Sequence, residues 1–97
     1  MPTVYLSYAH EDEKEVRELY RKLSDAGFNP WMVSEDVRPG EDWTKSSQRA
    51  IRETDIFLAI LSKNRAQRSG FYEQELDLAL KIKESKEGVY LVPVRLE

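Results

Sequence analysis

The stretch Asp55-Ile56-Phe57-Leu58-Ala59-Ile60-Leu61-Ser62 decides the fold of this 97-residue chain. It is an unbroken apolar run between two polar residues, and it is far too short to span a membrane. A half-exposed strand alternates apolar and polar residues, whereas a strand covered on both faces is continuously apolar. We therefore predict a central strand of a parallel sheet, with helices packed on both of its faces.

Strand and helix patterns alternate on either side of this run. Short β-branched and aromatic runs predict strands at Thr3–Tyr8, Phe28–Val33 and Val89–Leu96. Apolar residues at helical spacing predict helices from His10 to Ala26, around Trp43–Ile51 and over Phe71–Lys83. Polar loops are expected at Ser34–Asp42, with its Pro39-Gly40 turn, and at Lys63–Ser69. The order βαβαβαβ indicates one α/β domain over residues 1–97, and Pro93 favours an edge position for the last strand.

Composition excludes several classes of function. The chain has no cysteine and one histidine, which rules out disulfides and thiolate metal sites and argues against a zinc centre. Its net charge of -3 argues against direct nucleic-acid binding. No run is long enough for a membrane span, and the start lacks a signal-peptide pattern, so we expect a cytoplasmic domain that does not bind membranes.

The predicted sheet places any ligand site at the carboxyl ends of its strands. Three segments end there, namely Ser7-Tyr8-Ala9-His10, the Ser34–Asp42 loop and Ser62-Lys63-Asn64. The third helix also begins at this edge, and Glu75 lies in or beside its apolar stripe. A carboxylate partly removed from water suits acid–base or cation-stabilising chemistry. The alternative is that Glu75 extends to water and complements the helix dipole, and helical spacing alone leaves both interpretations open.

Other motifs at this edge predict structure more readily than chemistry. Isolated glycines give neither a dinucleotide fingerprint nor a phosphate-binding lysine loop. A phospho-acceptor receiver domain would need an aspartate where Ser62 stands. Ser7 and Ser62 have no suitably spaced histidine–carboxylate pair and read as capping residues, while Trp31 and Trp43 read as core residues.

Five motifs in order resemble the Toll/interleukin-1 receptor (TIR) domain family, in its prokaryotic branch. They cover essentially the whole chain and are Val4-Tyr5-Leu6-Ser7-Tyr8-Ala9-His10-Glu11-Asp12, Gly27–Trp31 with Val37–Trp43, Ala50–Ser62, Ser69–Leu76 and Val92–Leu96. The resemblance implies a flavodoxin-like three-layer sandwich with strand order 2-1-3-4, followed in a complete domain by a fifth strand. It also suggests that the chain is truncated after Glu97 or cut from a longer protein, with a fused sensor or effector domain.

The resemblance implies that NAD+ is a substrate, with no separate cofactor or metal. Enzymatic members cleave the nicotinamide–ribose bond with a glutamate four residues after an aromatic residue, here Glu75 after Phe71. By the same resemblance Tyr8 and His10 would line the nucleotide side, and Trp43 would border the pocket or the assembly surface. The loop Asp36-Val37-Arg38-Pro39-Gly40 would mediate self-association with other TIR domains, and the expected role is prokaryotic defence.

Two departures from the enzymatic pattern keep a second function open. Val33 stands where several enzymatic members carry an aspartate, and Phe71 replaces the usual tryptophan. The alternative is a non-catalytic TIR module that assembles signalling complexes.

Overall fold

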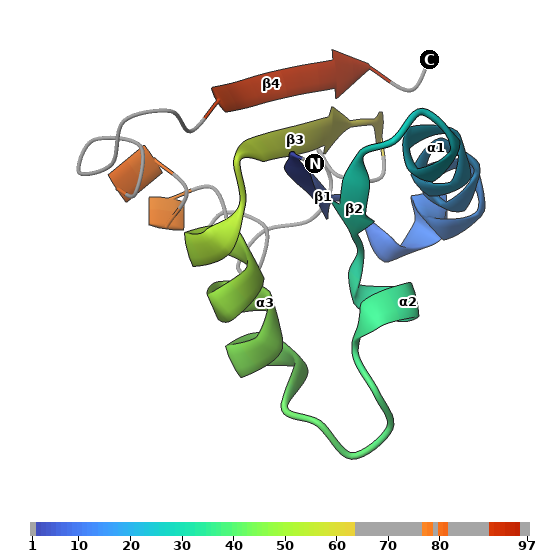
Figure 1. Ribbon diagram of the computed structural model, residues 1–97. Helices are drawn as coiled ribbons and strands as arrows, with labels where there is room; N and C mark the ends of the chain where they lie inside the picture. Colours follow the sequence, from blue (N-terminus) through green and yellow to red (C-terminus); the bar gives the residue numbers. More distant parts are fainter. Residues whose placement is uncertain (1, 64–76, 79, 82–89, 96–97) are drawn as a thin grey trace.

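The computed structural model describes residues 2–63, 77–78, 80–81 and 90–95 (Figure 1). The elements, in chain order, are β1 Thr3–Ser7, the 3-10 turn η1 His10–Asp12, α1 Glu13–Asp25, β2 Asn29–Trp31, α2 Val33–Asp36, α3 Trp43–Glu53, β3 Ile56–Leu61 and β4 Tyr90–Arg95. The two pairs 77–78 and 80–81 are helical. The rest of the predicted helix Phe71–Lys83 and most of the predicted loop Lys63–Ser69 lie outside the described residues.

The four strands form one parallel sheet in the order β2-β1-β3-β4. The apolar run of the opening stretch is β3, which pairs with β1 on one side and with β4 on the other. The predicted α/β class, strand order and central position of this run are therefore confirmed. The sheet order reverses between β1 and β3, which defines the switch point of the fold.

The sheet buries a separate apolar cluster on each face. Alternate strand residues point to opposite faces, and α1 covers the face that carries Val4, Leu6, Leu58 and Ile60. On the other face the buried cluster is Tyr5, Ile51, Phe57 and Ala59, where α3 supplies Ile51. Figure 1 shows α1 and α3 on opposite sides of the sheet. Both predicted layers of helix are thus present among the described residues.

Each outer strand of the described sheet carries a proline on its open side. The N–H of Tyr90 donates to Asp55 in front of β3, and that of Asn29 donates to Pro2 in front of β1. Successive residues of a strand direct their backbone groups to opposite sides, so Pro93 and Pro30 face away from their neighbouring strands. Neither proline removes a ladder hydrogen bond. The predicted edge position of Pro93 therefore holds in this sheet.

The segment after β2 differs from its prediction. Val33–Asp36 forms the short helix α2, although the sequence pattern predicted a strand as far as Val33 and a loop from Ser34. The N–H of Met32, the residue before the helix, donates to the Asp36 carboxylate at 2.9 Å, a contact that stabilises this single turn. Asp36 is consequently the last residue of α2, and the loop that we call the assembly loop is Val37–Glu41. Figure 1 shows this loop extending away from the sheet between α2 and α3.

Candidate functional site

The carboxyl ends of β1 and β3 meet at the switch point of the sheet. Asp12 of η1 lies there with 7% of its surface exposed, and its carboxylate accepts a hydrogen bond from the hydroxyl of Ser62. This contact ties the connection after β1 to the residue that follows β3. Ser62 is therefore a partner of a buried carboxylate. Asp12 was missed by the sequence interpretation, because it stands in an acidic run that reads as the first turn of a helix.

Tyr8 and His10 belong to the same connection but have different surroundings. The Tyr8 ring is 5% exposed and packs in the cluster on the α1 face. Its hydroxyl donates to Ser34 Oγ at 3.1 Å and accepts from the Ser34 N–H at 3.4 Å. The His10 side chain is 85% exposed, and its Nδ1 lies 4.0 Å from a Glu13 carboxylate oxygen. The His10 side chain is thus exposed at this edge, whereas the buried Tyr8 holds α2 through its hydroxyl.

The assembly loop is fixed at both ends by short polar contacts. The Arg38 N–H donates to Glu41 Oε1 at 2.8 Å, and the Glu41 N–H donates back to the Arg38 carbonyl at 3.1 Å. Gly40 lies between them with φ of +88°, a conformation that favours glycine. Asp42 then caps α3 by accepting from the N–H groups of Thr44 and Lys45. The Pro39-Gly40 turn of the prediction is therefore a closed turn, and its surroundings leave Pro39 and Gly40 exposed.

Two of the predicted site residues lie outside the described residues, namely Glu75 and Phe71. Trp43 begins α3 directly after the Asp42 cap, and its side chain is also outside the described part. The nearest described neighbour of Glu75 in the sequence is Asp77. The next residue, Leu78, packs against the apolar cluster on the α3 face. The helix that carries Glu75 in the prediction therefore has its described part on that face.

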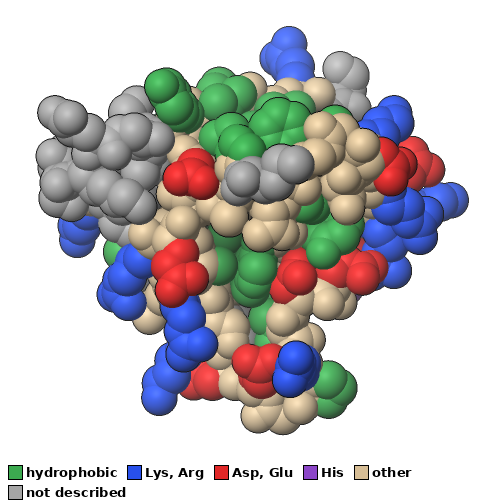
Figure 2. Space-filling view, viewed as in Figure 1, with side chains coloured by type: hydrophobic (Ala, Val, Ile, Leu, Met, Phe, Trp, Pro, Cys, Tyr) green, Lys and Arg blue, Asp and Glu red, His purple; other side chains and the backbone are tan. Residues whose placement is uncertain are grey.

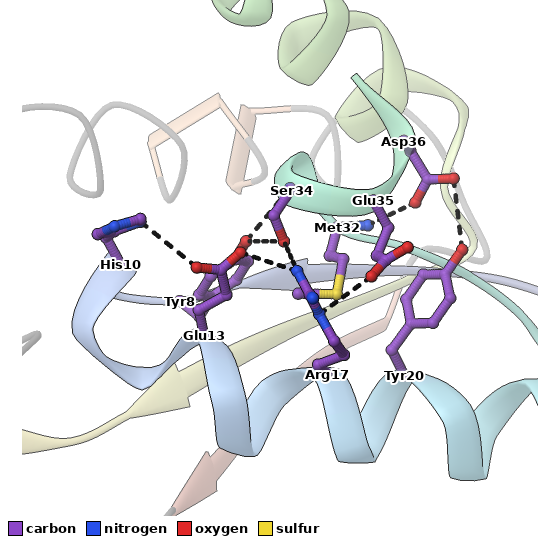
Figure 3. A network of polar contacts seen from close by, with 9 residues as sticks. All are labelled: Tyr8, His10, Glu13, Arg17, Tyr20, Met32, Ser34, Glu35 and Asp36. Carbon is purple, nitrogen blue, oxygen red and sulfur yellow. Dashed lines mark hydrogen bonds and ion pairs between the residues drawn. The ribbon is translucent and has the colours of Figure 1, made fainter. Parts of the chain in front are cut away.

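A polar network joins α2 to α1 and to Tyr8, which directly follows β1 (Figure 3). Three successive residues of α2 contact side chains from outside the helix. We call these three contacts the α2 clamp: Ser34 with Tyr8 at 3.1 Å, Glu35 with Arg17 at 3.0 Å, and Asp36 with Tyr20 at 3.4 Å. The sequence interpretation missed Arg17 and Tyr20. Only their spacing of three residues, which places them on one side of α1, could have suggested that they act together.

Arg17 is the centre of this network. One guanidinium nitrogen contacts Glu13 at 2.9 Å and Ser34 Oγ at 3.4 Å, while Nε faces Glu35. Nε is buried and forms no hydrogen bond to any described residue. The ion pair with Glu35 therefore offsets the cost of burying this nitrogen. An exposed ion pair contributes about 0–1 kcal/mol. The Arg17 and Glu35 side chains are each 37% exposed, so we expect their ion pair to contribute an energy in this range.

Desolvation raises the pKa of the Asp36 carboxyl above its usual value, with a smaller upward contribution from Glu35. The hydrogen bonds from Met32 and Tyr20 act in the opposite direction because they stabilise the carboxylate. Desolvation and the neighbouring Asp36 charge also raise the pKa of the Tyr20 hydroxyl, which keeps it protonated as a donor. The hydrogen bonds of the clamp therefore offset only part of the cost of removing the Asp36 carboxylate from water.

A separate open cavity of about 380 Å³ lies between β2, α2 and α3. Its lining includes Trp31, Glu41, Arg49 and Glu53. The Trp31 ring stacks on Tyr5 with centroids 5.1 Å apart, so it is part of the packing that the sequence interpretation expected. The cavity also borders Thr3 and Asn29, at the amino ends of β1 and β2, and it is therefore distinct from the switch point.

Exposed apolar side chains gather over the outer strand β4. Tyr90 is 65% exposed and Val92 39%, and Leu61 at the end of β3 is 43% exposed. Figure 2 shows hydrophobic surface at the top of the view, over β4. None of the helices within the described residues is long and apolar enough to cross a membrane. The described part of the chain likewise holds no group of three side chains suited to a metal ion.

The parallel sheet with order 2-1-3-4 and helices on both faces defines the class as flavodoxin-like α/β. Within that class, the family model described as "TIR domain" matches residues 4–97. The chain therefore belongs to the TIR domain family, as the five sequence motifs predicted.

Comparison with solved structures supports the same assignment. The chain superposes with a TM-score of 0.83 and 29% identity on a chain from the "Structure of the activated Roq1 resistosome directly recognizing the pathogen effector XopQ (TIR domains)". The match covers 98% of this chain but only 57% of that one. A comparison with curated protein sequences gave no match.

Proposed function

We propose that this TIR domain hydrolyses NAD+ at the nicotinamide–ribose bond and that self-association activates it. Glu75 is the proposed catalytic residue, and His10, Phe71 and Trp43 are proposed to contact the substrate. Tyr8 is proposed to support the nucleotide side from beneath, because its ring is buried and its hydroxyl holds Ser34. Prokaryotic defence remains the proposed setting, and a fused sensor or effector domain the proposed context.

Cleavage of the nicotinamide–ribose bond mainly requires a carboxylate positioned near the ribose. When the bond between ribose C1′ and the nicotinamide nitrogen breaks, its electron pair neutralises the pyridinium and leaves an oxocarbenium-like ribose. The Glu75 carboxylate would stabilise that charge. Water then adds to C1′ and loses a proton, which gives ADP-ribose, whereas attack by a group of the ADP-ribose itself gives a cyclic form.

The proposal is supported by the family of the chain together with the position of Glu75 in the sequence. The chain is a TIR domain, and Glu75 stands four residues after Phe71 in the order that enzymatic TIR domains use. Leu78, three residues later, packs on the α3 face of the sheet. The switch point lies at the carboxyl ends of the strands, where open parallel sheets bind ligands. The His10 side chain is exposed at that edge, which supports its proposed contact with the nucleotide.

The test is nicotinamide release by the protein clustered on a scaffold, with Glu75→Gln as the variant. Glu73→Gln is the matched control, since it makes the same change two residues away in the same helix pattern. We expect loss of at least about 100-fold for Glu75→Gln, the scale on which one electrostatic contact acts in a transition state, and little change for Glu73→Gln. Equal release by both variants would contradict the assignment of Glu75.

The second candidate is a non-catalytic assembly module, and Val33 favours it. Where several enzymatic members carry an aspartate, Val33 begins α2 and packs against the cluster on the α1 face. A ribose contact from this position is therefore replaced by core packing. Wild-type protein that forms assemblies and releases no nicotinamide would establish this candidate.

A further inference from the structure

The α2 clamp lies immediately before the assembly loop. The Val37 N–H, the first of the loop, donates to the Val33 carbonyl at 3.2 Å and so continues α2. The loop then closes on itself through Arg38 and Glu41, and Asp42 joins it to α3. Because these contacts close the turn, the direction of the loop depends on the elements at its ends. At the amino end that element is a single helical turn, which is too short to be stable by itself.

Side chains of α1, together with Tyr8 after β1, therefore decide where α2 lies. Arg17 contributes most to the α2 clamp, because one guanidinium contacts both Glu35 and Ser34 and is held in turn by Glu13. Displacement of α2 would leave the buried Nε without its compensating charge. Tyr8 and Tyr20 each add one hydroxyl contact on either side of Arg17. Figure 3 shows the three side chains in a row beneath α2.

We propose that Arg17, through the α2 clamp, presets the direction of the assembly loop and thereby favours the self-association of the proposed function. The expected effect on self-association rests on that proposed function. A preset loop loses less conformational freedom when the partner binds, so the clamp contributes to affinity without touching the partner. Arg17 is thus a positioning residue for the assembly surface.

The experiment compares Arg17→Met with Arg21→Met in the full chain. Arg21 is exposed four residues further along α1 and forms no ion pair with α2 among residues 2–63. The first readout is amide hydrogen exchange at Val37, Arg38 and Glu41, whose N–H groups all donate hydrogen bonds. The second is self-association by sedimentation velocity. Both are read beside the denaturant midpoint, and Glu35→Gln serves as a second variant that leaves Arg17 in place.

We expect Arg17→Met to accelerate exchange at the three loop amides and to weaken self-association, each about fivefold, the scale of one lost ion pair. Glu35→Gln should act in the same direction, and Arg21→Met should change neither. Equal loop exchange in Arg17→Met and Arg21→Met would overturn the clamp. Faster loop exchange with unchanged self-association would overturn the preset orientation. A wild-type chain that stays monomeric would contradict the self-association of the proposed function. The hydrogen exchange of the loop amides would still show whether Arg17 positions the loop.

Discussion

The aromatic row on the α3 face of the sheet and the α2 clamp beside α1 are held by different kinds of contact. On the α3 face, three aromatic rings stack in a row, with Tyr5 between Trp31 and Phe57 at centroid distances of 5.1 and 5.3 Å. On the α1 side, α2 is held by hydroxyl groups and ion pairs, of which each contributes little by itself. The first arrangement stabilises the domain, and the second determines where an exposed loop points. The comparison predicts that apolar changes cost more stability than polar changes do.

Phe57→Ala should give the largest effect on stability. Phe57 is fully buried in the aromatic row, and truncation of such a residue typically costs about 3–5 kcal/mol. Phe28→Ala is the matched control, because Phe28 is 36% exposed and the same truncation there removes less buried surface. Denaturant unfolding measures both. Equal losses would mean that the stack is no more important to stability than a surface ring.

Asp12 should come next, although it lies at the candidate site. Asp12→Ala removes the partner of the Ser62 hydroxyl and should lower the free energy of unfolding by about 1–3 kcal/mol. Ser62→Ala and the double variant complete a cycle that isolates the contact between them. Additive losses in that cycle would show that the two side chains do not stabilise each other.

Tyr8→Phe and Tyr20→Phe sharpen the comparison, since each removes one hydroxyl of the α2 clamp. The Tyr8 hydroxyl is part-buried and both donates to and accepts from Ser34, while the Tyr20 contact is exposed and longer. We expect about 1 kcal/mol for Tyr8→Phe, the usual net value of a hydrogen bond, and less for Tyr20→Phe. Unfolding experiments that reverse this order would contradict the geometry of the clamp.

Asp36→Asn should give the smallest effect, visible only as a pH dependence. Because the folded-state pKa of Asp36 is raised above 3.8, its contribution to stability is full below 3.8 and is lost as the pH rises through the folded-state value. The stability of the wild type relative to Asp36→Asn should therefore decline with rising pH over this interval. A wild type that gains on the variant over the same interval would contradict the direction of the shift.

The sequence predicted what depends on apolar patterning. The run Ile56–Leu61 has the pattern of a covered strand and is one, and Gly27, with φ of +94°, ends α1 as expected. Gly40 likewise provides a positive φ in the predicted turn. These features depend on near neighbours in the chain, so the local pattern is sufficient to reveal them.

Long-range polar contacts escaped prediction for a physical reason. Asp12 and Ser62 are 50 residues apart, and Tyr8 and Ser34 are 26 apart. In the sequence these side chains resemble ordinary capping or surface residues, and only the folded sheet brings them together. The helix α2 was missed for the same reason, because its stability comes from Tyr8 and from α1 more than from its own four residues.

We propose that a positioned surface loop makes NAD+ cleavage depend on assembly. The most direct test is nicotinamide release per protein molecule, measured over a range of protein concentrations for wild type and for Glu75→Gln. We predict that release per molecule rises with the concentration of the wild type, in step with self-association, and stays at background for Glu75→Gln. Release that is independent of concentration, or that persists in Glu75→Gln, would contradict it.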